Sequence, residues 1–498
     1  MQNLPEEFKN RIKRLLGDAA NEFFDTYVTA SHTSLRINTL RLPSNKGLNI
    51  LQQCSLLGEK PAQIPWEKSG FYYDENDRPG RHVLHEAGFY YIQEASAQAP
   101  VSFLDPRPGE RILDLCAAPG GKSTQIGGAM KGEGILVSNE IHPSRAKILS
   151  ENVERMGITN ALVTRESPDR LVSFFPGYFD KILVDAPCSG EGMFRKNDEA
   201  VSEWSVENVL HCAERQLFIL EQADRMLRPG GRIVYSTCTF SPEENEKLVE
   251  AFLTSHPDYH LCPMDLSGGM LSSHLDKGNL NRGKDDRMPV FDEISPARGM
   301  VRLFPHKLKG EGHFAALLEK KNRGLYTSET MPAPLPKSGS PKKLNRNSKS
   351  KKGASAPDLS TALDFLKQDP KYADIDRIFM MGDQVYLLPD ARLALQGLTL
   401  VRPGLHLGTL ERGRFLPSMA LARALTVDDN FNYVNLSVSD PDDMDLLASY
   451  LEGATFPYMG EPGWYLICCE GLGIGWGKLA GGIMKNHYPK GLRKRLNH

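Results

Sequence analysis

The 498-residue sequence lacks the features of membrane, secreted and zinc-finger proteins. No stretch reaches the roughly 18 uninterrupted apolar residues that indicate a transmembrane helix. The opening MQNLPEEFKNRIKRLL carries charges where a signal peptide would be apolar, which argues against secretion. The 8 cysteines are scattered and include no CxxC pair, so neither a disulfide framework nor a structural zinc site is expected. These absences predict a reduced, cytoplasmic protein without a metal and without a membrane partner.

A strong net charge is also lacking, because 60 Lys and Arg nearly balance 62 Asp and Glu. Overall charge therefore neither predicts nor excludes a nucleic-acid partner. Two local segments are basic without a single acid: residues 336–353, and the tail from Lys485, which includes Lys490, Arg493, Lys494 and Arg495. Such runs are typical of phosphate contact, although a solvated linker and a frayed terminus would look the same.

Short apolar strands alternate with helical stretches between Pro100 and Lys320. The strand-like runs are RILDL (111–115), GILVSNE (134–140), ALVTR (161–165), KILVDAP (181–187) and GRIVYSTC (231–238). Helical patterns, such as those over 144–156 and 207–227, lie between them. This alternation predicts an α/β fold with a mostly parallel sheet covered by helices on both faces.

The rest of the chain divides around that region. Residues 1–99 form a predicted N-terminal module, which opens with a helix whose apolar face comprises Leu4, Phe8, Ile12 and Leu15. After the domain over 100–321, residues 322–357 are rich in Pro, Ser, Lys and Asn and predict a basic disordered linker. Residues 358–428 form a first C-terminal module. Residues 429–498 are predicted to form a small β-rich domain, because their stretch over 463–482 alternates apolar residues with glycines.

Three motifs stand where predicted strands end: DLCAAPGGKS (114–123), DAPCSG (185–190) and STCTFSPEEN (236–245). Ligands of open parallel sheets bind outside the carboxyl ends of the strands, so these loops should share one crevice. The small residues of the first motif would let backbone N–H groups approach a ligand, unless they only make a tight turn. Glu140, at the end of the second strand, is placed to bind ribose hydroxyls. A GxGxxG sequence is missing, so a dinucleotide site is not supported.

Each of the two later motifs carries a cysteine. A lone cysteine at a strand end is usually a small buried apolar residue. Two of them, in polar loops that face a cofactor turn, favour a reactive role instead.

With these three motifs unbroken and in order, the chain resembles the Sun (Fmu) family of S-adenosylmethionine-dependent RNA 5-methylcytosine methyltransferases. Residues 300–307 and 310–314 are similar to the closing strands of that family. The flanking regions resemble its RsmF-like branch, which modifies small-subunit ribosomal RNA. The resemblance implies a Rossmann-like methyltransferase sheet with an N-terminal α/β module over 1–99 that binds RNA and a C-terminal, β-rich PUA-like RNA-binding domain over 429–498.

The resemblance also implies catalytic roles. Carbon 5 of cytosine is a poor nucleophile, and a thiolate that adds to carbon 6 activates it for methylation. Cys238 is then the nucleophile, and Cys188 assists release of the methylated product. Asp185 is placed to hydrogen-bond the N3/N4 edge of the base and to favour its protonation. Lys122 helps to position the base and Asp185.

S-adenosyl-L-methionine is the implied cofactor. Its binding turn comprises Cys116, Ala117, Ala118, Pro119, Gly120, Gly121 and Lys122. Glu140 would hold the ribose, and Asp185 lies beside the cofactor. Family members place an Asp near the adenine after the third strand, where this chain has Ser167. Asp169, two residues later, is the alternative.

The resemblance therefore implies an RNA (cytosine-5) methyltransferase that acts on 16S rRNA or the small ribosomal subunit. A tRNA substrate is the alternative within the same chemistry, and a non-catalytic ribosome-assembly factor is the alternative outside it. Loss of Cys238 or of the glycine turn would mark such a factor, and neither is lost. Cys468 and Cys469 lie in an apolar strand and are predicted to be structural. The nearby Trp464, Tyr465 and Trp476 would either pack in the core or stack on bases.

Overall fold

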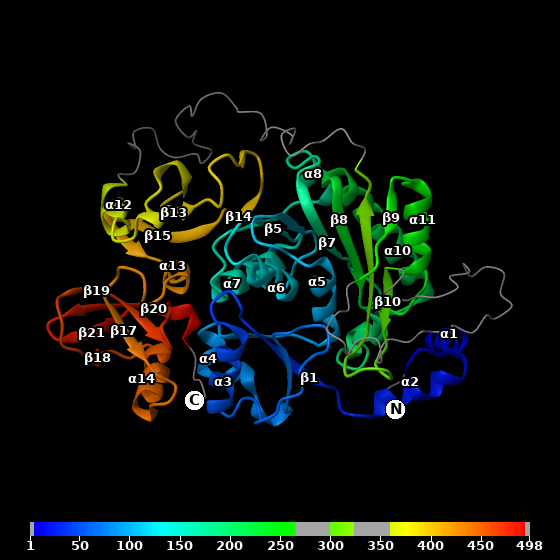
Figure 1. Cartoon of the computed structure of the whole chain (residues 1–498), viewed down its shortest axis with the longest axis horizontal. Helices are drawn as coiled ribbons and strands as arrows, with labels where there is room; N and C mark the ends of the chain where they lie inside the picture. The colour runs from blue at the N-terminus through cyan, green and yellow to red at the C-terminus, as the bar shows by residue number, and fades with distance from the viewer. Residues whose placement is uncertain (1–3, 265–298, 323–358, 494–498) are drawn as a thin grey trace.

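A nine-stranded sheet forms the centre of the computed structural model, which describes residues 4–264, 299–322 and 359–493 (Figure 1). Its strand order is β10-β11-β8-β7-β4-β5-β6-β14, with β9 paired to β11. Five neighbouring strands are parallel: β4 (Arg111–Asp114), β5 (Ile135–Asn139), β6 (Ala161–Thr164), β7 (Phe179–Asp185) and β8 (Leu227–Thr237). The antiparallel strands beyond β8 are β9 (Tyr259–Leu261), β10 (Met300–Leu303) and β11 (His313–Lys320). The predicted mostly parallel sheet is confirmed.

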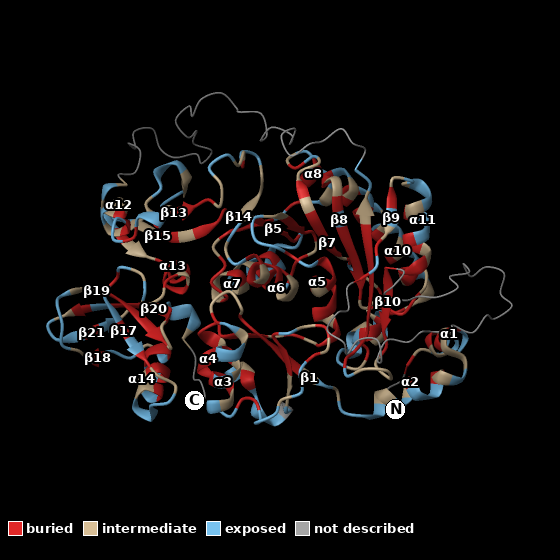
Figure 2. Ribbon diagram, viewed as in Figure 1, coloured by how far each residue is buried: buried red, intermediate tan, exposed pale blue. Residues whose placement is uncertain are grey.

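Helices cover both faces of this sheet, because both faces of its strands are apolar. Ile112 points into one core and its neighbour Leu113 into the other. The first core includes α5 (Ala99–Leu104), α6 (Gly121–Met130) and α7 (Pro143–Arg155). The second includes α8 (Pro168–Val172), α10 (Val206–Met226) and α11 (Glu246–Ser255). Figure 2 shows the central strands as the most continuously buried part of the molecule.

The N-terminal region contributes two separate units. Helices α1 (Glu6–Leu16) and α2 (Ala20–Asp25) bury the predicted apolar face against Phe194, Phe240 and Phe304. These aromatic residues flank the loops that follow β7 and β8, so the first helices support the side of the molecule where the motifs lie. The sheet β2-β1-β3 follows, with β1 (Thr33–Ile37), α3 (Ser44–Gln53), β2 (Gly70–Tyr73), α4 (Val83–Glu86) and β3 (Tyr90–Ile92).

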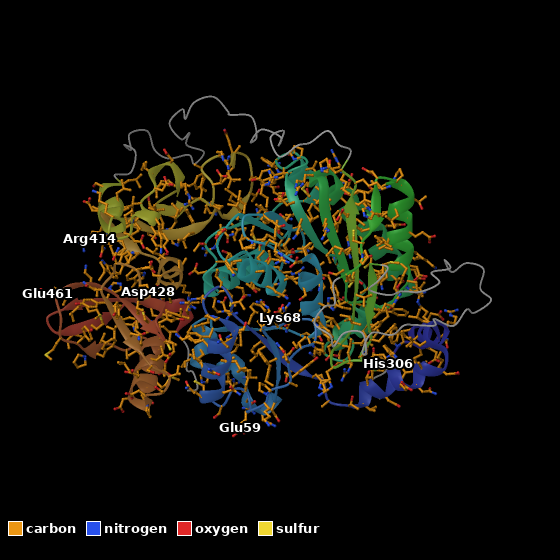
Figure 3. The ribbon with its side chains drawn as sticks, viewed as in Figure 1. Glu59, Lys68, His306, Arg414, Asp428 and Glu461 are labelled. Atoms are coloured by element: carbon orange, nitrogen blue, oxygen red, sulfur yellow. The ribbon has the colours of Figure 1, made fainter. Side chains whose placement is uncertain are left out.

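The C-terminal part contains two further sheets. The first comprises β12 (Ile378–Met381), β13 (Gln384–Leu387), β15 (Leu405–Glu411) and β16 (Arg414–Pro417) and is flanked by α12 (Ser360–Leu366) and α13 (Met419–Ala424). The second has the order β17-β19-β20-β21-β18 and packs on α14 (Pro441–Glu452). Its strands are β17 (Tyr433–Leu436), β18 (Phe456–Pro457), β19 (Gly463–Cys469), β20 (Leu472–Ala480) and β21 (Ile483–Asn486). Charged side chains at this end, such as the labelled Arg414, Asp428 and Glu461, are exposed (Figure 3).

The regions predicted as separate modules are joined in two places, by a shared sheet and by a shared apolar core. Strand β14 (Leu400–Arg402), from within 358–428, pairs with β6 and completes the central sheet. An edge strand presents unpaired backbone groups, and β14 satisfies those of β6. In addition, one continuous apolar core joins the N-terminal sheet to both C-terminal sheets. The sequence did not predict either connection, because both depend on contacts between distant segments.

The predicted linker over 322–357 lies outside the described residues except for Asn322, and the basic run it carries lies outside them too. In the tail, the Arg493 guanidinium donates hydrogen bonds to the backbone carbonyl of Tyr488 and is therefore used within the fold. Among the residues that the structure describes, no helix is both long enough and apolar enough to cross a membrane.

Candidate active site

The three predicted motif loops meet at the carboxyl ends of β4, β7 and β8. Strands β4 and β7 are neighbours at the point where the chain order of the sheet reverses, which is where open α/β sheets bind ligands. The register pairs Asp185 with Ser236 across β7 and β8, so the second and third motifs begin side by side.

The two motif cysteines lie in contact. The Sγ atoms of Cys188 and Cys238 are 3.3 Å apart, both residues are half-buried, and both are free thiols. The hydrogen bond to Cys238 and burial together raise the pKa of Cys188 well above its ordinary value. Cys188 therefore keeps its proton and can donate it toward the sulfur of Cys238.

Buried Glu244, from the third motif, joins the two cysteine loops. Its carboxylate accepts hydrogen bonds from the backbone N–H of Ser189 at 2.9 Å, from the Ser189 hydroxyl, and from Gln216 Nε2 at 2.8 Å. The Ser189 hydroxyl also contacts Thr239 Oγ1 at 2.8 Å. Burial raises the pKa of Glu244 to about 7. Because Ser189 follows Cys188 and Thr239 follows Cys238, this carboxylate fixes the distance between the thiols.

A second buried carboxylate supports the same loops. Glu191 accepts hydrogen bonds from the Phe240 backbone N–H at 2.8 Å and from Ser241 Oγ at 2.6 Å. The adjacent Gly192 donates its N–H to the carbonyl of Cys238 at 2.8 Å. A Cβ atom at Gly192 would lie 2.9 Å from that carbonyl oxygen, so only glycine permits this approach.

Asp185 ends β7 and begins the second motif, next to the cysteine loops. Its Oδ2 accepts a hydrogen bond from Lys122 Nζ at 2.7 Å, and its Oδ1 accepts one from Ser236 Oγ at 2.8 Å. His313 Nε2 lies 3.8 Å from Oδ1. Burial alone would raise the pKa of Asp185, but Lys122 and His313 outweigh it and hold the pKa well below the usual range. The carboxyl group is therefore a stable carboxylate with a fixed orientation.

The structure thus adds His313 to the residues that the sequence singled out. It stands in Gly310–Phe314, which the sequence analysis treated only as a closing strand. The signal that could have identified it is a single histidine at the start of an otherwise apolar strand, HFAALL. Glu244 was likewise missed, although it belongs to a quoted motif.

The predicted cofactor turn is held in place by α7. Arg145 donates to the carbonyl of Ala118 and Asn152 to that of Pro119, both at 2.9 Å. Gly120 caps α6 in the left-handed region, with φ +115°, a conformation that glycine adopts without strain. The turn is thereby fixed as a cradle at a helix N-terminus.

Acidic groups surround this turn. Burial, reinforced by the charges of Asp114, Asp185 and Glu140, raises the pKa of Cys116 strongly. Glu140 is buried and accepts a hydrogen bond from the backbone N–H of His142 at 2.9 Å. Asp114 is completely buried, and burial raises its pKa to about 7. The negative field suits a cationic sulfonium, and the placement of Glu140 suits ribose hydroxyls, so these residues fit the predicted cofactor.

The two candidates for the adenine contact lie together near the start of α8. Ser167 precedes the helix and Asp169 lies in its first turn, and both are exposed. A hydrogen bond from the Ser167 side chain lowers the pKa of Asp169. The contact of either residue with adenine stays a prediction.

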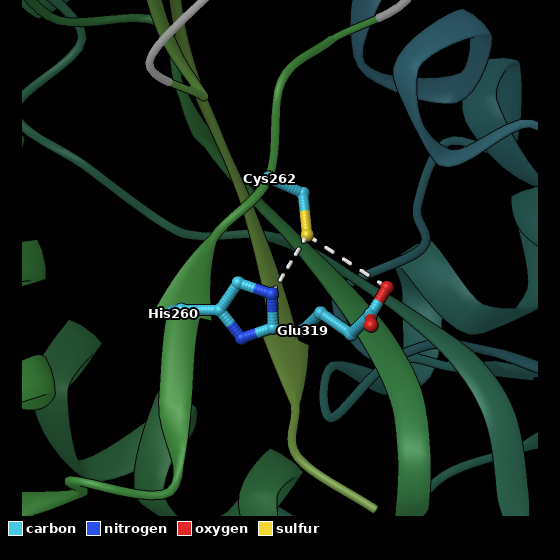
Figure 4. Close-up of side chains that lie close together, drawn as sticks. All are labelled: His260, Cys262 and Glu319. Carbon is cyan, nitrogen blue, oxygen red and sulfur yellow. Dashed lines mark hydrogen bonds between the residues drawn. The ribbon is translucent and has the colours of Figure 1, made fainter.

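One group of side chains has the composition of a metal site. His260 Nε2 lies 3.5 Å and Glu319 Oε2 lies 3.7 Å from Cys262 Sγ (Figure 4). Arg232 Nε donates to the same Glu319 oxygen at 2.7 Å. A cation therefore already neutralises this carboxylate, and His260 is exposed, so the cluster is accounted for by its own contacts.

The C-terminal residues set apart by the sequence are mainly structural. Cys468 and Cys469 are fully buried in β19, as predicted. Trp476 is 2% exposed and donates from Nε1 to the carbonyl of Ser418, so it packs in the core. Trp464 is half-buried, and Lys478 Nζ lies 5.3 Å from the centre of its ring.

Comparisons with known proteins agree with the architecture. Residues 101–319 match the family described as 16S rRNA methyltransferase RsmB/F. Residues 4–95 match the N-terminal domain of 16S rRNA methyltransferase RsmF, residues 364–425 its first C-terminal domain, and residues 441–494 its PUA domain.

Two relatives that align with almost the whole chain are described as methyltransferases of small-subunit ribosomal RNA. The chain is 32% identical over 504 residues to "Ribosomal RNA small subunit methyltransferase F" of Vibrio vulnificus strain YJ016, covering 99% of this chain and 98% of the relative. It is 31% identical over 506 residues to the protein of the same description from Erwinia tasmaniensis, covering 98% and 96%. A solved methyltransferase homolog from Pyrococcus horikoshii shares 28% identity with a TM-score of 0.54, covering 64% of this chain and 96% of that one.

The fold, the four matched regions and the full-length relatives agree on one assignment. The chain has a Rossmann-like methyltransferase sheet, an N-terminal α/β module and a C-terminal PUA domain. It belongs to the RsmB/F family of 16S rRNA methyltransferases and, within that family, has the domain composition of RsmF.

Proposed function

We propose that this protein methylates carbon 5 of a cytosine in 16S rRNA, with S-adenosyl-L-methionine as the methyl donor. One observation carries the proposal: two free thiols lie 3.3 Å apart at the carboxyl ends of the strands, beside Asp185, whose carboxylate is held by Lys122 of the cradle-shaped turn. A methyl transfer to an oxygen or to an exocyclic nitrogen needs no thiol. Carbon 5 of a pyrimidine needs one, because a nucleophile at carbon 6 must first raise its electron density.

Cys238 is the attacking thiol in this proposal. It follows β8 directly, and the Glu244 and Glu191 contacts hold the surrounding loops rigidly. The Cys238 thiol gives up its proton as sulfur bonds to carbon 6, and the electron pair of the carbon 5–carbon 6 double bond moves through the ring so that N3 takes up one proton. Asp185, held by Lys122 at 2.7 Å, accepts hydrogen bonds from the protonated N3 and from the N4 amine.

Cys188 acts in the second half of the reaction. Once the methyl group is in place, the carbon 5 proton passes to a water molecule, and its electron pair re-forms the carbon 5–carbon 6 double bond as the bond from Cys238 to carbon 6 breaks. Cys188 holds its proton firmly next to Cys238 Sγ and can stabilise the departing thiolate by a hydrogen bond. The two thiols therefore divide attack and release between them.

The cofactor, when bound, supplies the methyl group as a sulfonium. The residues from Cys116 to Lys122 would cradle it, and Glu140 would accept hydrogen bonds from the ribose. Asp185 lies between this turn and the cysteines, so it can contact both ligands. Asp169 or Ser167 would lie on the adenine side.

The RNA reaches the crevice with its target base out of the stack, as enzymes that act on a base require. The N-terminal module over 1–99, the PUA domain and the basic segment over 336–353 would bind the phosphate backbone and set the position. We place the enzyme in the cytoplasm, where its rRNA substrate is found. If the protein methylates tRNA instead, the proposed substrate is wrong but the proposed cytosine-5 chemistry still holds.

Bisulfite sequencing of 16S rRNA and tRNA tests the proposal. RNA from cells that lack the gene is compared with RNA from cells that carry the wild type or Cys238→Ala. We expect one cytosine of 16S rRNA to be methylated only with the wild type. Methylation of tRNA alone would change the substrate. Wild-type methylation that persists in Cys238→Ala would overturn the cysteine mechanism.

A further inference from the structure

We propose that His313 is a positioning residue for Asp185 and that Ser96 and Glu94 of the N-terminal region set the orientation of its ring. The proposal rests on the proposed function, in which Asp185 binds the target cytosine. It assigns to the N-terminal module a part in the chemistry, in addition to RNA binding.

His313 begins β11, the antiparallel neighbour of β8, and is 6% exposed. The adjacent Phe314 pairs with Thr237, the residue before Cys238. Register therefore places the histidine next to the two catalytic loops. Its Nδ1 lies 3.3 Å from Ser96 Oγ, and its Nε2 lies 3.8 Å from Asp185 Oδ1.

The hydrogen bonds of the Ser96 hydroxyl determine whether Nδ1 of His313 carries a proton. The single hydroxyl hydrogen of Ser96 is donated to the Glu94 carboxylate. Ser96 Oγ can then only accept, and it already accepts from the Gly312 backbone N–H at 3.2 Å. The contact with His313 must therefore be an N–H donated from Nδ1, because a hydroxyl has two acceptor positions and one donor. The Nδ1 position of the ring is fixed by residues from outside the methyltransferase domain.

The other nitrogen, Nε2, is buried and makes no hydrogen bond with any of the residues that the structure describes. It faces the Asp185 carboxylate. A protonated Nε2 forms an ion pair there, whereas an unprotonated one would oppose a lone pair to a negative oxygen. On its other side the ring is joined through Ser96 to the Glu94 carboxylate, which accepts from both the Ser96 hydroxyl and its backbone N–H.

His313 thus supplies the third contact of Asp185. Lys122 holds Oδ2 and the Ser236 hydroxyl holds Oδ1, but the Ser236 bond is neutral. His313 is the group with an ionisable N–H on the Oδ1 side, and it limits how far this oxygen can move when the base binds. Orientation matters because a displacement of about 1 Å in a catalytic group can cost up to about a hundredfold in rate.

Two amide variants separate this role from a purely structural one. Glutamine at position 313 keeps a donor near the place of Nε2, whereas asparagine keeps one near the place of Nδ1. We expect His313→Asn to lower kcat for rRNA methylation about tenfold or more. We expect His313→Gln to retain clearly more kcat than His313→Asn, because its amide N–H still faces Asp185 Oδ1 although the positive charge is lost. The KM values for RNA and cofactor should stay within about twofold in both, because neither variant alters the binding surfaces.

A structural role through Ser96 predicts the reverse order, with His313→Asn active and His313→Gln impaired. That order, or wild-type kcat in both variants, would overturn the proposal. Ser96→Ala provides a second measurement that leaves the histidine unchanged. It should lower kcat several-fold in the wild-type background and have no further effect in His313→Asn. Additive losses would contradict the proposed chain of contacts.

The same assays distinguish failure of the proposed function from failure of this inference. A wild-type enzyme that methylates no cytosine overturns both. A wild-type enzyme that methylates cytosine, with a His313→Asn variant that is equally fast, overturns only the role of His313. Thermal melting of each variant shows whether a loss of kcat accompanies a loss of folded protein.

Discussion

Two pairs of cysteines in two different sheets differ in what their neighbourhood allows them to do. Cys188 and Cys238 are 50 residues apart in the chain, yet their sulfur atoms are 3.3 Å apart in the crevice of the central sheet. Cys468 and Cys469 are adjacent in the chain, but successive side chains of a strand point to opposite faces. The first pair stands beyond the ends of strands, and the second stands within one.

The surroundings follow from these positions. The loops of the first pair are lined by polar groups such as Glu244, Ser189 and Asp185, and both thiols are half-buried. The second pair is fully buried in an apolar core, and burial raises the pKa of Cys468 to about 12. A strand end can therefore offer a thiol to a ligand, whereas a strand interior uses it as packing.

The largest expected effect comes from the catalytic pair. Cys238→Ala should lower methyl transfer at least about a thousandfold, because the nucleophile is lost, while cofactor binding persists. Cys188→Ala should still attack and methylate but stall at release, so a covalent protein–RNA adduct accumulates. A denaturing gel of each variant with RNA and S-adenosylmethionine measures the adduct.

The double variant is the control for that gel. Cys188→Ala combined with Cys238→Ala cannot form the bond, so the slow-migrating band should disappear. If instead Cys238→Ala gives the band and Cys188→Ala does not, the two roles are exchanged. If neither gives it, the covalent mechanism is wrong.

The next largest loss of kcat is expected for Glu244. Its variants test whether this carboxylate holds Cys188 and Cys238 in the geometry that Cys468 and Cys469 lack. Glu244→Ala leaves the Ser189 N–H without its acceptor and removes one of the two acceptors of the Gln216 amide, so the cysteine loops should lose their fixed separation. We expect kcat to fall about 10- to 100-fold, with cofactor affinity unchanged. Glu244→Gln should be milder, since one amide oxygen can still accept from both donors.

Glu243 offers a matched control for Glu244. It is the preceding residue of the same motif, but its carboxylate pairs with Arg11 of α1 and contacts neither cysteine loop. Steady-state kinetics should show little change in Glu243→Ala. Equal losses in Glu243→Ala and Glu244→Ala would mean that the motif acts by general stability only.

The sequence predicted the parts of this site that are local. The strands that end at Asp114, Asp185 and Thr237 follow from short β-branched runs, and the motif cysteines follow from their place after those strands. The contacts of Glu244 and His313 depend on which side chains meet across loops and strands. The pairing of β14 with β6 depends on segments more than 200 residues apart. The periodicity of apolar residues predicts single strands and helices, but it does not predict these contacts between distant segments.

A smaller effect concerns the pH dependence of stability. It comes from buried Asp114, which can ionise near neutral pH, unlike the buried thiols of Cys468 and Cys469. Burial raises the pKa of Asp114 to about 7 from an ordinary value of 3.8. The folded state therefore binds this proton more tightly than the unfolded state does. The stability that results is complete below about pH 4 and is lost as the pH rises through 7.

Asp114→Asn removes this ionisation. Denaturant unfolding at pH 5 and pH 8 should show that the wild type loses stability between these values and that the variant loses about 1–2 kcal/mol less. The Ser123 hydroxyl, 2.6 Å from Oδ2, can still donate to the amide oxygen. An unchanged pH dependence in Asp114→Asn would show that the carboxyl group is not the source.

The smallest effect concerns the second cysteine pair and completes the comparison. Cys468→Ala and Cys469→Ala each remove one sulfur atom from a close-packed core, so each should cost about 1 kcal/mol of unfolding free energy. Neither should change kcat or adduct formation, because β19 lies in the C-terminal sheet and contributes no group to the active site.

In the native protein, a small alkylating reagent should modify Cys188 or Cys238 and leave Cys468 and Cys469 unmodified until denaturant is added. Mass spectrometry of the labelled peptides measures this directly. If Cys468 reacts as fast as Cys238 in the folded enzyme, or if Cys468→Ala slows methyl transfer without lowering stability, then placement on a strand does not separate reactive from structural thiols in this protein.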